Sequence, residues 1–504
     1  MRAFYENFPF FCIFLAILCG VTTAAVRDGR KAYRLTLSLC GVVLVLSLVL
    51  LVRVYDSGES FLYTMGRFAA PYGNAIKAGP LQALLAVMFS GVMGISLLGG
   101  SRDLFQDILP EKQRFYFVMT DLLLAGMLSL TYSNDIFTGY VFIEITTIAA
   151  CAMVMAKDTG TNLISTIRYL FMSLLGSGLF LIGLTLLNSI TGYLLMPPLA
   201  EAVAALVRHG RYQTVLLVSM GLLVGGLGIK AAMFPFHMWL PDAHGGATTA
   251  SSAILSGLVL KGYIVFLITL MLRVFGLQLF QETGLDRCML VMGLLGMVVG
   301  SLTAMREYHI KRMLANSSVA QIGYIFMGLG MGTQAGVVAA CFHILVHSTC
   351  KPLLFCCAGR LSAVSGHHKS LHMLRGSAYR DAAAGVGFTV GALSMIGLPL
   401  LGGFVSKLYF SQAALGSPWM AVTLTVIALS TVLNALYYVP AIMAIWVRPP
   451  EEEERRILAD VGAEALAFDR SFFTAAVLFI AIIFGLGILY HPVLNVIAEG
   501  VLLA

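Results

Sequence analysis

Runs of about twenty apolar residues recur along almost the whole of this chain, and a helix of that length crosses the hydrocarbon core of a bilayer. Hydrophobic residues make up 59% of the sequence and charged residues 11%, whereas roughly a quarter of an ordinary soluble domain is charged. We therefore expect an all-α integral membrane protein. The runs predict about fourteen transmembrane helices, near residues 9–27, 34–53, 80–100, 114–132, 134–156, 163–187, 213–239, 247–273, 286–305, 311–331, 334–360, 382–413, 419–446 and 471–490.

The flanks of the first run set the expected orientation. Arg27, Arg30, Lys31 and Arg34 follow this run in place of a cleavage site, so we expect a retained helix, with a signal peptide as the alternative. Most of the 32 Lys and Arg residues fall in loops on the same side as these four. Because basic loops stay in the cytoplasm, both termini are expected outside.

Several charged residues lie inside the predicted spans. A charge at membrane depth costs at least about 2.5–3.5 kcal/mol on insertion scales, so charges that persist there are usually functional. These residues therefore predict an ion path, and they are Arg168, Lys230, Lys261, Lys351, Lys407, Glu144 and Asp121.

Two of the predicted spans are interrupted by Gly and Pro. Pro235 follows Lys230 in the seventh span, and Pro399 precedes Lys407 in the twelfth. Proline removes a backbone donor and clashes with the preceding turn, so both helices are expected to be discontinuous. Paired interruptions indicate a transport site between inverted repeats. They predict two inverted five-helix repeats, formed by spans 4–8 (residues 114–273) and spans 9–13 (residues 286–446). An N-terminal three-helix segment (1–113) precedes the repeats, and a cytoplasmic loop with the last helix (447–504) follows them.

Other site types have no recognisable motif here. The nine cysteines contain no Cys-x-x-Cys spacing, and no phosphate-binding or dinucleotide-binding glycine motif is present. No basic patch with interleaved aromatics suggests nucleic acid. We therefore expect no cofactor and no metal, although His367, His368 and His372 could offer metal ligands.

Four sequence blocks resemble one known family. They are residues 230–261, 134–144, 311–324 and 342–359, and they are similar to hallmark blocks of antiporter-like membrane subunits. Such subunits occur in respiratory complex I, in Mrp-type Na⁺/H⁺ antiporters and in membrane-bound energy-converting hydrogenases. The resemblance covers roughly residues 80–446, and it implies a multi-pass protein of a prokaryotic plasma membrane.

The resemblance implies a role for each buried charge. Glu144 resembles the glutamate that pairs with the lysine of the broken seventh helix, here Lys230, and Lys261 resembles the central carrier. Lys407 resembles the terminal site on the broken twelfth helix. His343, His347 and Lys351 are spaced four residues apart, which places them on one helix face, and His347 resembles a relay between the halves.

Structural alternatives exist for several of these residues. Lys351 and Lys407 could extend to the membrane interface, and Arg168 could anchor its span there. Asp121 could bond a neighbouring helix. His237 and His244 could hold loops instead of relaying protons. Pro352 is expected to kink the helix beside Lys351. Val346 stands where a polar residue often precedes the histidine in the family. Residues 451–456 are expected to form a solvated face or a docking edge for a neighbouring subunit.

These features predict a proton-translocating, antiporter-like subunit of a larger membrane complex, with other membrane subunits and peripheral redox subunits as partners. The alternative is a subunit of an Mrp-type Na⁺/H⁺ antiporter without redox chemistry. A quinone-binding enzyme in its own right is least favoured, because this chain shows no redox site of its own. The sequence does not separate H⁺ from Na⁺.

Overall fold

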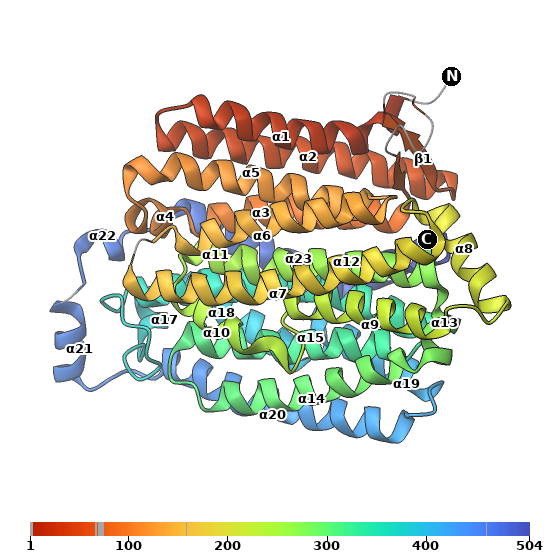
Figure 1. Cartoon of the computed structure of the whole chain (residues 1–504). Coiled ribbons are helices and arrows are strands. Elements are labelled where there is room, and N and C mark those ends of the chain that lie inside the picture. The colour runs from red at the N-terminus through yellow and green to blue at the C-terminus, as the bar shows by residue number, and fades with distance from the viewer. Residues whose placement is uncertain (1–3, 66–67, 69–74, 158, 460, 504) are drawn as a thin grey trace.

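The computed structural model describes residues 4–65, 68, 75–157, 159–459 and 461–503, so the first three residues and Ala504, at the outer ends of the first and last predicted segments, lie outside it. Nearly all described residues are helical, and the long helices lie side by side in one bundle (Figure 1). At one end of the bundle α21 (Glu451–Ala459) and α22 (Ala463–Leu466) protrude, and we call this the α21 end. Both termini and α8 (Met196–Arg208) lie at the opposite end, the α8 end.

Twelve helical stretches of the described residues are long and apolar enough to cross a membrane. The predicted multi-pass, all-α fold is therefore confirmed, while the count of fourteen stays a prediction. Ten of the stretches are single helices: α1 (Phe8–Ala25, preceded by η1, Phe4–Asn7), α2 (Gly29–Ser57), α3 (Pro80–Gly99), α5 (Pro110–Tyr132), α6 (Ile136–Met155), α7 (Gly160–Thr191), α14 (Leu285–Met305), α16 (Gln334–Ala363), α20 (Met420–Trp446) and α23 (Arg470–Ile488).

One of the two remaining stretches is the first half of a broken helix, as predicted. Helix α9 (Gln213–Lys230) stops at Lys230, and after a turn the chain continues in η3 (Phe236–Met238) and α10 (Trp239–Gly246). The other predicted break separates α18 (Ala382–Ile396) from α19 (Gly402–Leu415). Asp381 begins α18 as its N-cap and accepts a hydrogen bond from Ala384 N at 3.0 Å.

The other remaining stretch, Thr249–Thr283, is the most buried of the twelve and contains two π-helical segments. It runs without interruption through α11 (Thr249–Ile254), η4 (Leu255–Val259), α12 (Leu260–Leu270), η5 (Met271–Phe275) and α13 (Gly276–Thr283). Such π-turns are rare and are frequent at functional sites.

Helix α15 (Ile310–Gly330) lies in the interior, with every residue except Arg312 buried. Glycines bring it against α14. A Cβ at Gly330 would lie 2.2 Å from Leu290 N, and one at Gly323 would lie 2.6 Å from Met297 N. Small residues at such crossings let the helix backbones approach closely.

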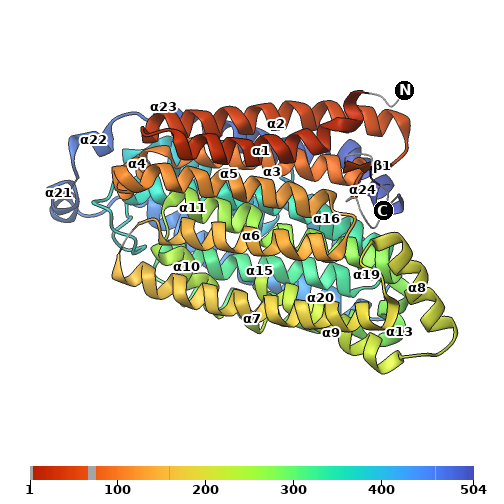
Figure 2. The ribbon, with the colours of Figure 1, turned by 45° about the horizontal axis from the view of Figure 1, so that its top comes forward.

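Some short elements were not predicted. Strands β1 (Phe61–Thr64) and β2 (Ala75–Ala78) pair antiparallel between α2 and α3, with Phe61 opposite Ala78. Helix α8 projects from the bundle (Figure 2) and buries an apolar edge formed by Met196, Leu199 and Val203. The remaining short helices are α4 (Ser101–Asp107), α17 (Ser377–Arg380) and α24 (Tyr490–Leu502).

Candidate functional site

Lys230 forms the centre of a first buried cluster. Its side chain is fully buried, and its ammonium lies 3.5 Å from the Glu144 carboxylate, so the predicted pairing of the two residues is present. The ammonium also donates to Thr147 Oγ1 at 2.7 Å, and Thr147 contacts the Tyr263 hydroxyl at 3.1 Å. Glu144 is 24% exposed and accepts a hydrogen bond from Ser177. The pair therefore joins a buried cation to a carboxylate nearer the protein surface.

Backbone packing fixes the position of Lys230. Gly176 of α7 faces Gly226 of α9 so closely that a Cβ on Gly176 would lie 2.7 Å from the Gly226 carbonyl and 3.2 Å from Lys230 Cγ. Lys230 is also the last residue of α9. Its charge therefore lies at the negative end of the half-helix dipole, where a cation is favoured.

Lys261 lies in the first turn of α12, directly after the π-helical segment η4, and is fully buried. Its ammonium donates to the carbonyl oxygen of Ser256, which belongs to the π-helical segment η4. The Ser256 hydroxyl contacts that of Ser318 on α15 at 2.9 Å. These contacts place a cation with no ion-pair partner, among the described residues, between α12 and α15.

Lys351 on α16 is held by three oxygens. Its ammonium donates to Leu314 O at 2.9 Å, to Ser317 Oγ at 2.8 Å and to Tyr438 Oη at 3.1 Å. The side chain is fully buried, so it does not extend to the membrane interface. Helix α16 continues through Pro352 without ending, so the proline does not interrupt the helix beside this lysine.

Two histidines extend this cluster along α16. The ring centroids of His343 and His347 lie 6.0 Å apart, and His343 Nδ1 contacts Ser406 Oγ on α19 at 2.6 Å. Within the described part of the chain, His343 Nε2 and both ring nitrogens of His347 make no hydrogen bond. Most buried polar atoms in proteins have a partner, so these imidazoles are exceptional.

Lys407 ends the series beside the second helix break. Its ammonium donates to the Ile396 carbonyl at 2.7 Å and to Thr431 Oγ1 at 3.0 Å, and it lies 5.5 Å from the Tyr324 ring centroid. Ile396 is the last residue of α18. Like Lys230, this lysine therefore places its charge at the C-terminal end of a half-helix.

The other three buried lysines and the two histidines of α16 form one buried row. The charges of Lys261 and Lys351 act on each other and on His347, and that of Lys407 acts on His343. No hydrogen bond between described residues joins Lys230 to Lys261, although Tyr263, a partner of Thr147, stands on the same helix as Lys261. We call the series Lys261, Lys351, His347, His343 and Lys407 the buried row.

Two accessory residues lie apart from this row. Asp121 is fully buried and accepts a hydrogen bond from Thr23 of α1 at 2.8 Å, which matches the alternative of bonding a neighbouring helix. Arg168 was expected among the buried charges, and this was wrong. Its side chain is 64% exposed and pairs with Asp242 at 2.6 Å, because it lies on the outward face of α7.

The two histidines of the first broken helix lie at different depths. His237 in η3 is 4% exposed, and its Nδ1 makes no hydrogen bond in the described structure. His244 on α10 is fully buried and stacks on Phe355 with ring centroids 4.6 Å apart. Neither of its ring nitrogens has a hydrogen-bond partner in the described part, and the charges of Lys261, Lys311 and Lys351 all act on it.

A polar cavity of about 460 Å³ opens at the α21 end. Lys311 lines it, is 4% exposed and donates to Ala247 O at 3.2 Å. Lys157 pairs with Asp107 at 2.7 Å on its wall. Lys369 also lines the cavity, and burial together with the neighbouring Lys157 charge lowers its pKa. Lys311 begins the tenth predicted span, where sequence gives no sign of burial, and the contacts with Ala247 and Thr249 come from a distant part of the chain.

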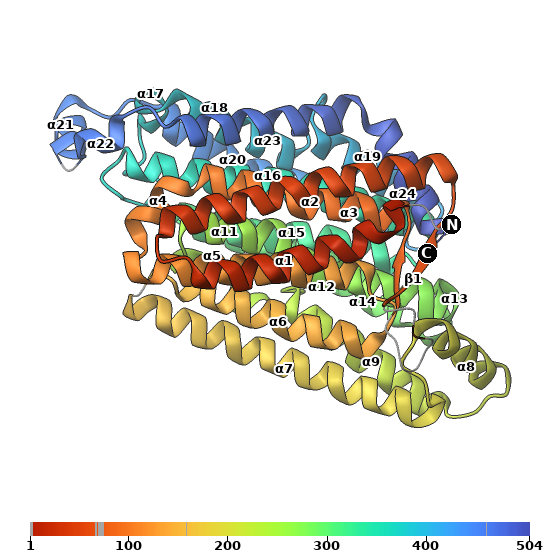
Figure 3. The ribbon, with the colours of Figure 1, turned by 90° about the horizontal axis from the view of Figure 1, so that it is seen from above.

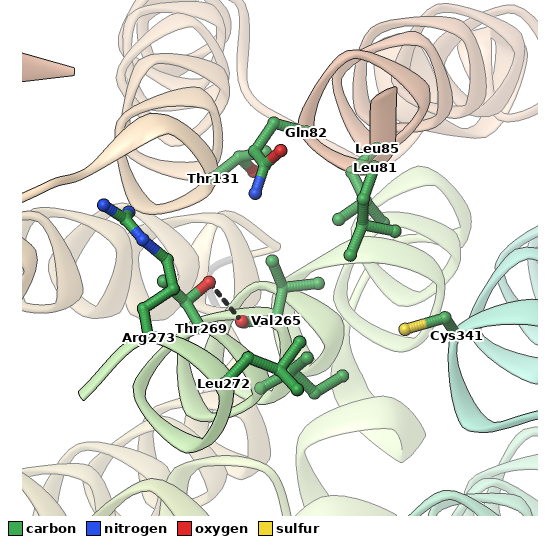
Figure 4. A pocket seen from close by; sticks show the side chains of 10 residues that line it. Leu81, Gln82, Leu85, Thr131, Val265, Thr269, Leu272, Arg273 and Cys341 are labelled. Carbon is green, nitrogen blue, oxygen red and sulfur yellow. Dashed lines mark hydrogen bonds between the residues drawn. The ribbon is translucent and has the colours of Figure 1, made fainter. Parts of the chain in front are cut away.

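A second, small cavity lies where α3, α5, α12, η5 and α16 meet (Figure 4). Its volume is about 10 Å³, roughly enough for one water. Gln82, Thr131 and Thr269 line it beside Arg273, which donates to Ser133 O at 3.2 Å. Thr269 is two turns, about 12 Å, from Lys261 along the same helix. Polar groups therefore continue from the buried row toward both ends of the bundle.

Comparisons with known proteins identify the family of this chain. Residues 133–433 match the family described as NADH:quinone oxidoreductase/Mrp antiporter, TM. The chain is 29% identical over 460 residues to the N-type NADH-quinone oxidoreductase subunit of Desulforudis audaxviator, covering 90% of this chain and 88% of the relative. It is 30% identical over 374 residues to the D-type Na⁺/H⁺ antiporter subunit of Alkalihalophilus pseudofirmus, covering 74% and 73%.

The fold comparison extends over almost the whole chain. A chain of the Mrp complex from Dietzia sp. DQ12-45-1b superposes with a TM-score of 0.86 at 21% identity, covering 99% of this chain and 97% of that one. Since the family match spans more than half of the sequence, the protein belongs to the NADH:quinone oxidoreductase/Mrp antiporter transmembrane family.

Proposed function

We propose that this protein is a proton-translocating, antiporter-like subunit of a larger membrane complex. The observation that carries the proposal is the buried row, in which lysines and histidines follow one another through the interior from α12 to α19. Buried ionisable groups at membrane depth are expensive and serve as proton relays when they are retained. Family membership supports the same conclusion.

In the proposed mechanism, the Glu144–Lys230 pair acts as a switch. Opening the contact removes the negative charge that stabilises the buried ammonium, so the lysine changes its affinity for a proton. Lys261 then serves as the central carrier, and His347 and His343 relay the proton along α16. Their unpartnered ring nitrogens can accept and donate in turn. Lys407 is the exit, and the transported ion is H⁺, with Na⁺ as the alternative.

The polar cavity at the α21 end is the proposed uptake site. It contains carboxylates and lysines, and the charges of Lys311 and of the central lysines Lys261 and Lys351 all act on His244. A proton taken up there would pass from His244 to Lys261 or Lys351. In this scheme Arg168 and Asp121 take no part, and His237 is a loop-anchoring residue.

The two helix breaks support an arrangement of inverted repeats at residues 114–273 and 286–446. Each break places one ammonium at the C-terminal end of a half-helix, Lys230 in the first and Lys407 in the second. Basic loops at the α21 end favour an orientation with that end in the cytoplasm. Both termini would then be outside, in the plasma membrane of a prokaryote.

The proposed driving module is a set of peripheral redox subunits, which act on this chain through neighbouring membrane subunits. Similarity to a subunit of an NADH-quinone oxidoreductase supports this choice. An Mrp-type Na⁺/H⁺ antiporter subunit is the second candidate, favoured by the similarity to a subunit of a Na⁺/H⁺ antiporter. Copurification from native membranes in mild detergent separates the two, because redox subunits accompany only the first.

Transport in reconstituted vesicles tests the proposed path. Lys230→Ala or Lys261→Ala should abolish coupled ion translocation while the complex still assembles, because each removes a proton carrier. Cys356→Ala is the matched control, since Cys356 is also buried, lies beside Gly99 of α3 and is outside the proposed path, and it should leave transport intact. Wild-type pumping by either lysine variant contradicts the proposal. Parallel traces with a pH dye and with ²²Na⁺ identify the ion.

A further inference from the structure

A second charged cavity at the α21 end is unrelated to the buried row. It has a volume of about 440 Å³ and lies where α2, α4 and α23 meet. Figure 3 shows α2 and α23 both extending to this end, and α3 packs against each of them. Arg30, Arg34, Arg102 and Arg470 line the cavity, against a single carboxylate, Asp469. We call these four residues the arginine cluster.

Most of the positive charge of the cluster is not neutralised within the described protein. Arg30, Arg34 and Arg470 are exposed and form no ion pair with any described carboxylate. Asp469 instead caps α23 by accepting from Phe472 N at 3.1 Å. The amino-terminal turn of α23, the positive end of its dipole, adds to the positive potential. The cavity therefore favours a polyvalent or phosphate-type anion.

The walls of the cavity are held in place. Arg102 donates to Ala467 O at 3.2 Å, and Arg360 donates to the same carbonyl at 2.7 Å, which fastens the segment before α23 to α4 and α16. On the other side, the Tyr33 ring packs on Phe105 with centroids 5.6 Å apart. The Tyr33 hydroxyl is buried in this wall.

Exposed apolar side chains lead away from the arginines along both long helices. On α2, Val42, Val45 and Val49 follow Arg34 on one face. On α23, Phe473 and Val477 follow Arg470 in the same way. A cationic cavity that continues into two apolar stripes matches a molecule with an anionic head and hydrocarbon tails. Basic pockets between transmembrane helices bind such headgroups on the cytoplasmic side.

We propose that the arginine cluster binds the phosphate headgroup of an anionic glycerophospholipid, with its acyl chains along α2 and α23. The lipid would fasten α23, the last long helix, to the amino-terminal pair α1 and α2. This assignment does not depend on the proposed transport function.

Lipid binding by the full chain in mild detergent tests the site. Short-chain phosphatidylglycerol, phosphatidylcholine with the same acyl chains, and inorganic phosphate are titrated in parallel, with native mass spectrometry and thermal shift as measurements. The wild type should prefer phosphatidylglycerol to phosphatidylcholine. R30Q/R34Q should lower the phosphatidylglycerol affinity about tenfold or more, given the contribution of each basic residue near an anionic headgroup.

The matched control is R27Q/K31Q, which removes the same charge from the same segment at two exposed residues that do not line the cavity. It should retain the phosphatidylglycerol preference. If R30Q/R34Q does not fold, R470Q should lower the same affinity severalfold. An equal loss of phosphatidylglycerol affinity in R27Q/K31Q would show that general surface charge causes the effect, and it would overturn the proposal. Saturation by inorganic phosphate alone would also overturn it, because the ligand would not be a lipid.

Discussion

At the residue scale, the Glu144–Lys230 contact is the most accessible point of the proposed path. Glu144→Gln keeps the shape of the side chain but removes the charge 3.5 Å from the buried ammonium. We expect proton translocation by the reconstituted complex to fall at least about tenfold, a change that corresponds to roughly 1.4 kcal/mol. Glu111→Gln, the same change at an exposed position on α5, should transport normally. Equal rates for both variants would contradict the switch.

The residues of the path were predictable from sequence to different degrees. Lys230, Lys261, Lys351 and Lys407 were found because a charge in an apolar run is conspicuous, and all four are buried. Arg168 gave the same signal, but the signal does not say which side of a helix a residue faces. Lys311 was missed for the opposite reason, since its burial arises from contacts with a distant segment.

At the scale of helices, the break between α18 and α19 depends on Gly397. Its φ of +101° is rarely adopted by residues with a Cβ, and a Cβ there would lie 3.0 Å from Lys407 Cδ. Gly397→Ala should therefore destabilise the protein by about 1–3 kcal/mol and slow translocation by displacing Lys407. Thermal unfolding and vesicle transport measure the two effects.

Gly225→Ala is the matched control, because Gly225 precedes the other break, has a helical conformation and has no atom within 4 Å of an added Cβ. Alanine is the better helix former, so this variant should be as stable as the wild type or slightly more so. Comparable losses in the two variants would mean that any added methyl group near a break is harmful, and Gly397 would have no special role.

The amino-terminal cap of α15 gives a pH-dependent prediction. His309 Nδ1 accepts from Arg312 N at 3.4 Å, and burial together with nearby Lys369 lowers its pKa from 6.5 to about 4. A histidine whose pKa is lower in the folded state stabilises the protein above pH 6.5, and this stabilisation is lost as pH falls toward 4. The Tm of the wild type should therefore fall over this range.

His309→Asn replaces the imidazole with a cap that does not titrate. The Tm of this variant should parallel that of the wild type above pH 7, and it should fall less between pH 6.5 and 4. Parallel Tm curves over the whole range would show that other groups cause the acid sensitivity and that the His309 cap contributes nothing to it.

The helices themselves were predicted unevenly. Both interruptions were expected from Pro235 and Pro399, because local chemistry decides where a helix can continue. Elements without a long apolar run, such as the β1–β2 hairpin and α8, gave no comparable signal. Their pairing and docking depend on the bundle beneath them, which no local pattern describes.

At the scale of the whole molecule, the two ends of the bundle carry cavities of different size and lining. The α21 end has two cavities of about 440 and 460 Å³ that are lined by several charged side chains, while a cavity of about 270 Å³ at the α8 end is lined mainly by apolar residues of α8, η5 and α13. In the proposed orientation the wide openings face the cytoplasm, where protons are taken up and where anionic lipids attract basic residues. Proton path and lipid site would thus share one membrane orientation.

Site-specific labelling tests this orientation directly. Cys288 is exposed and the other eight cysteines are buried, so Cys288→Ser gives a background with little reactivity. In intact cells, a membrane-impermeant maleimide should label Glu282→Cys on α13 at the α8 end. Arg455→Cys on α21, where the native side chain is 83% exposed, should be labelled only after permeabilisation. The reverse pattern would place the α21 end outside, and uptake through its polar cavity would then begin from the opposite side of the membrane.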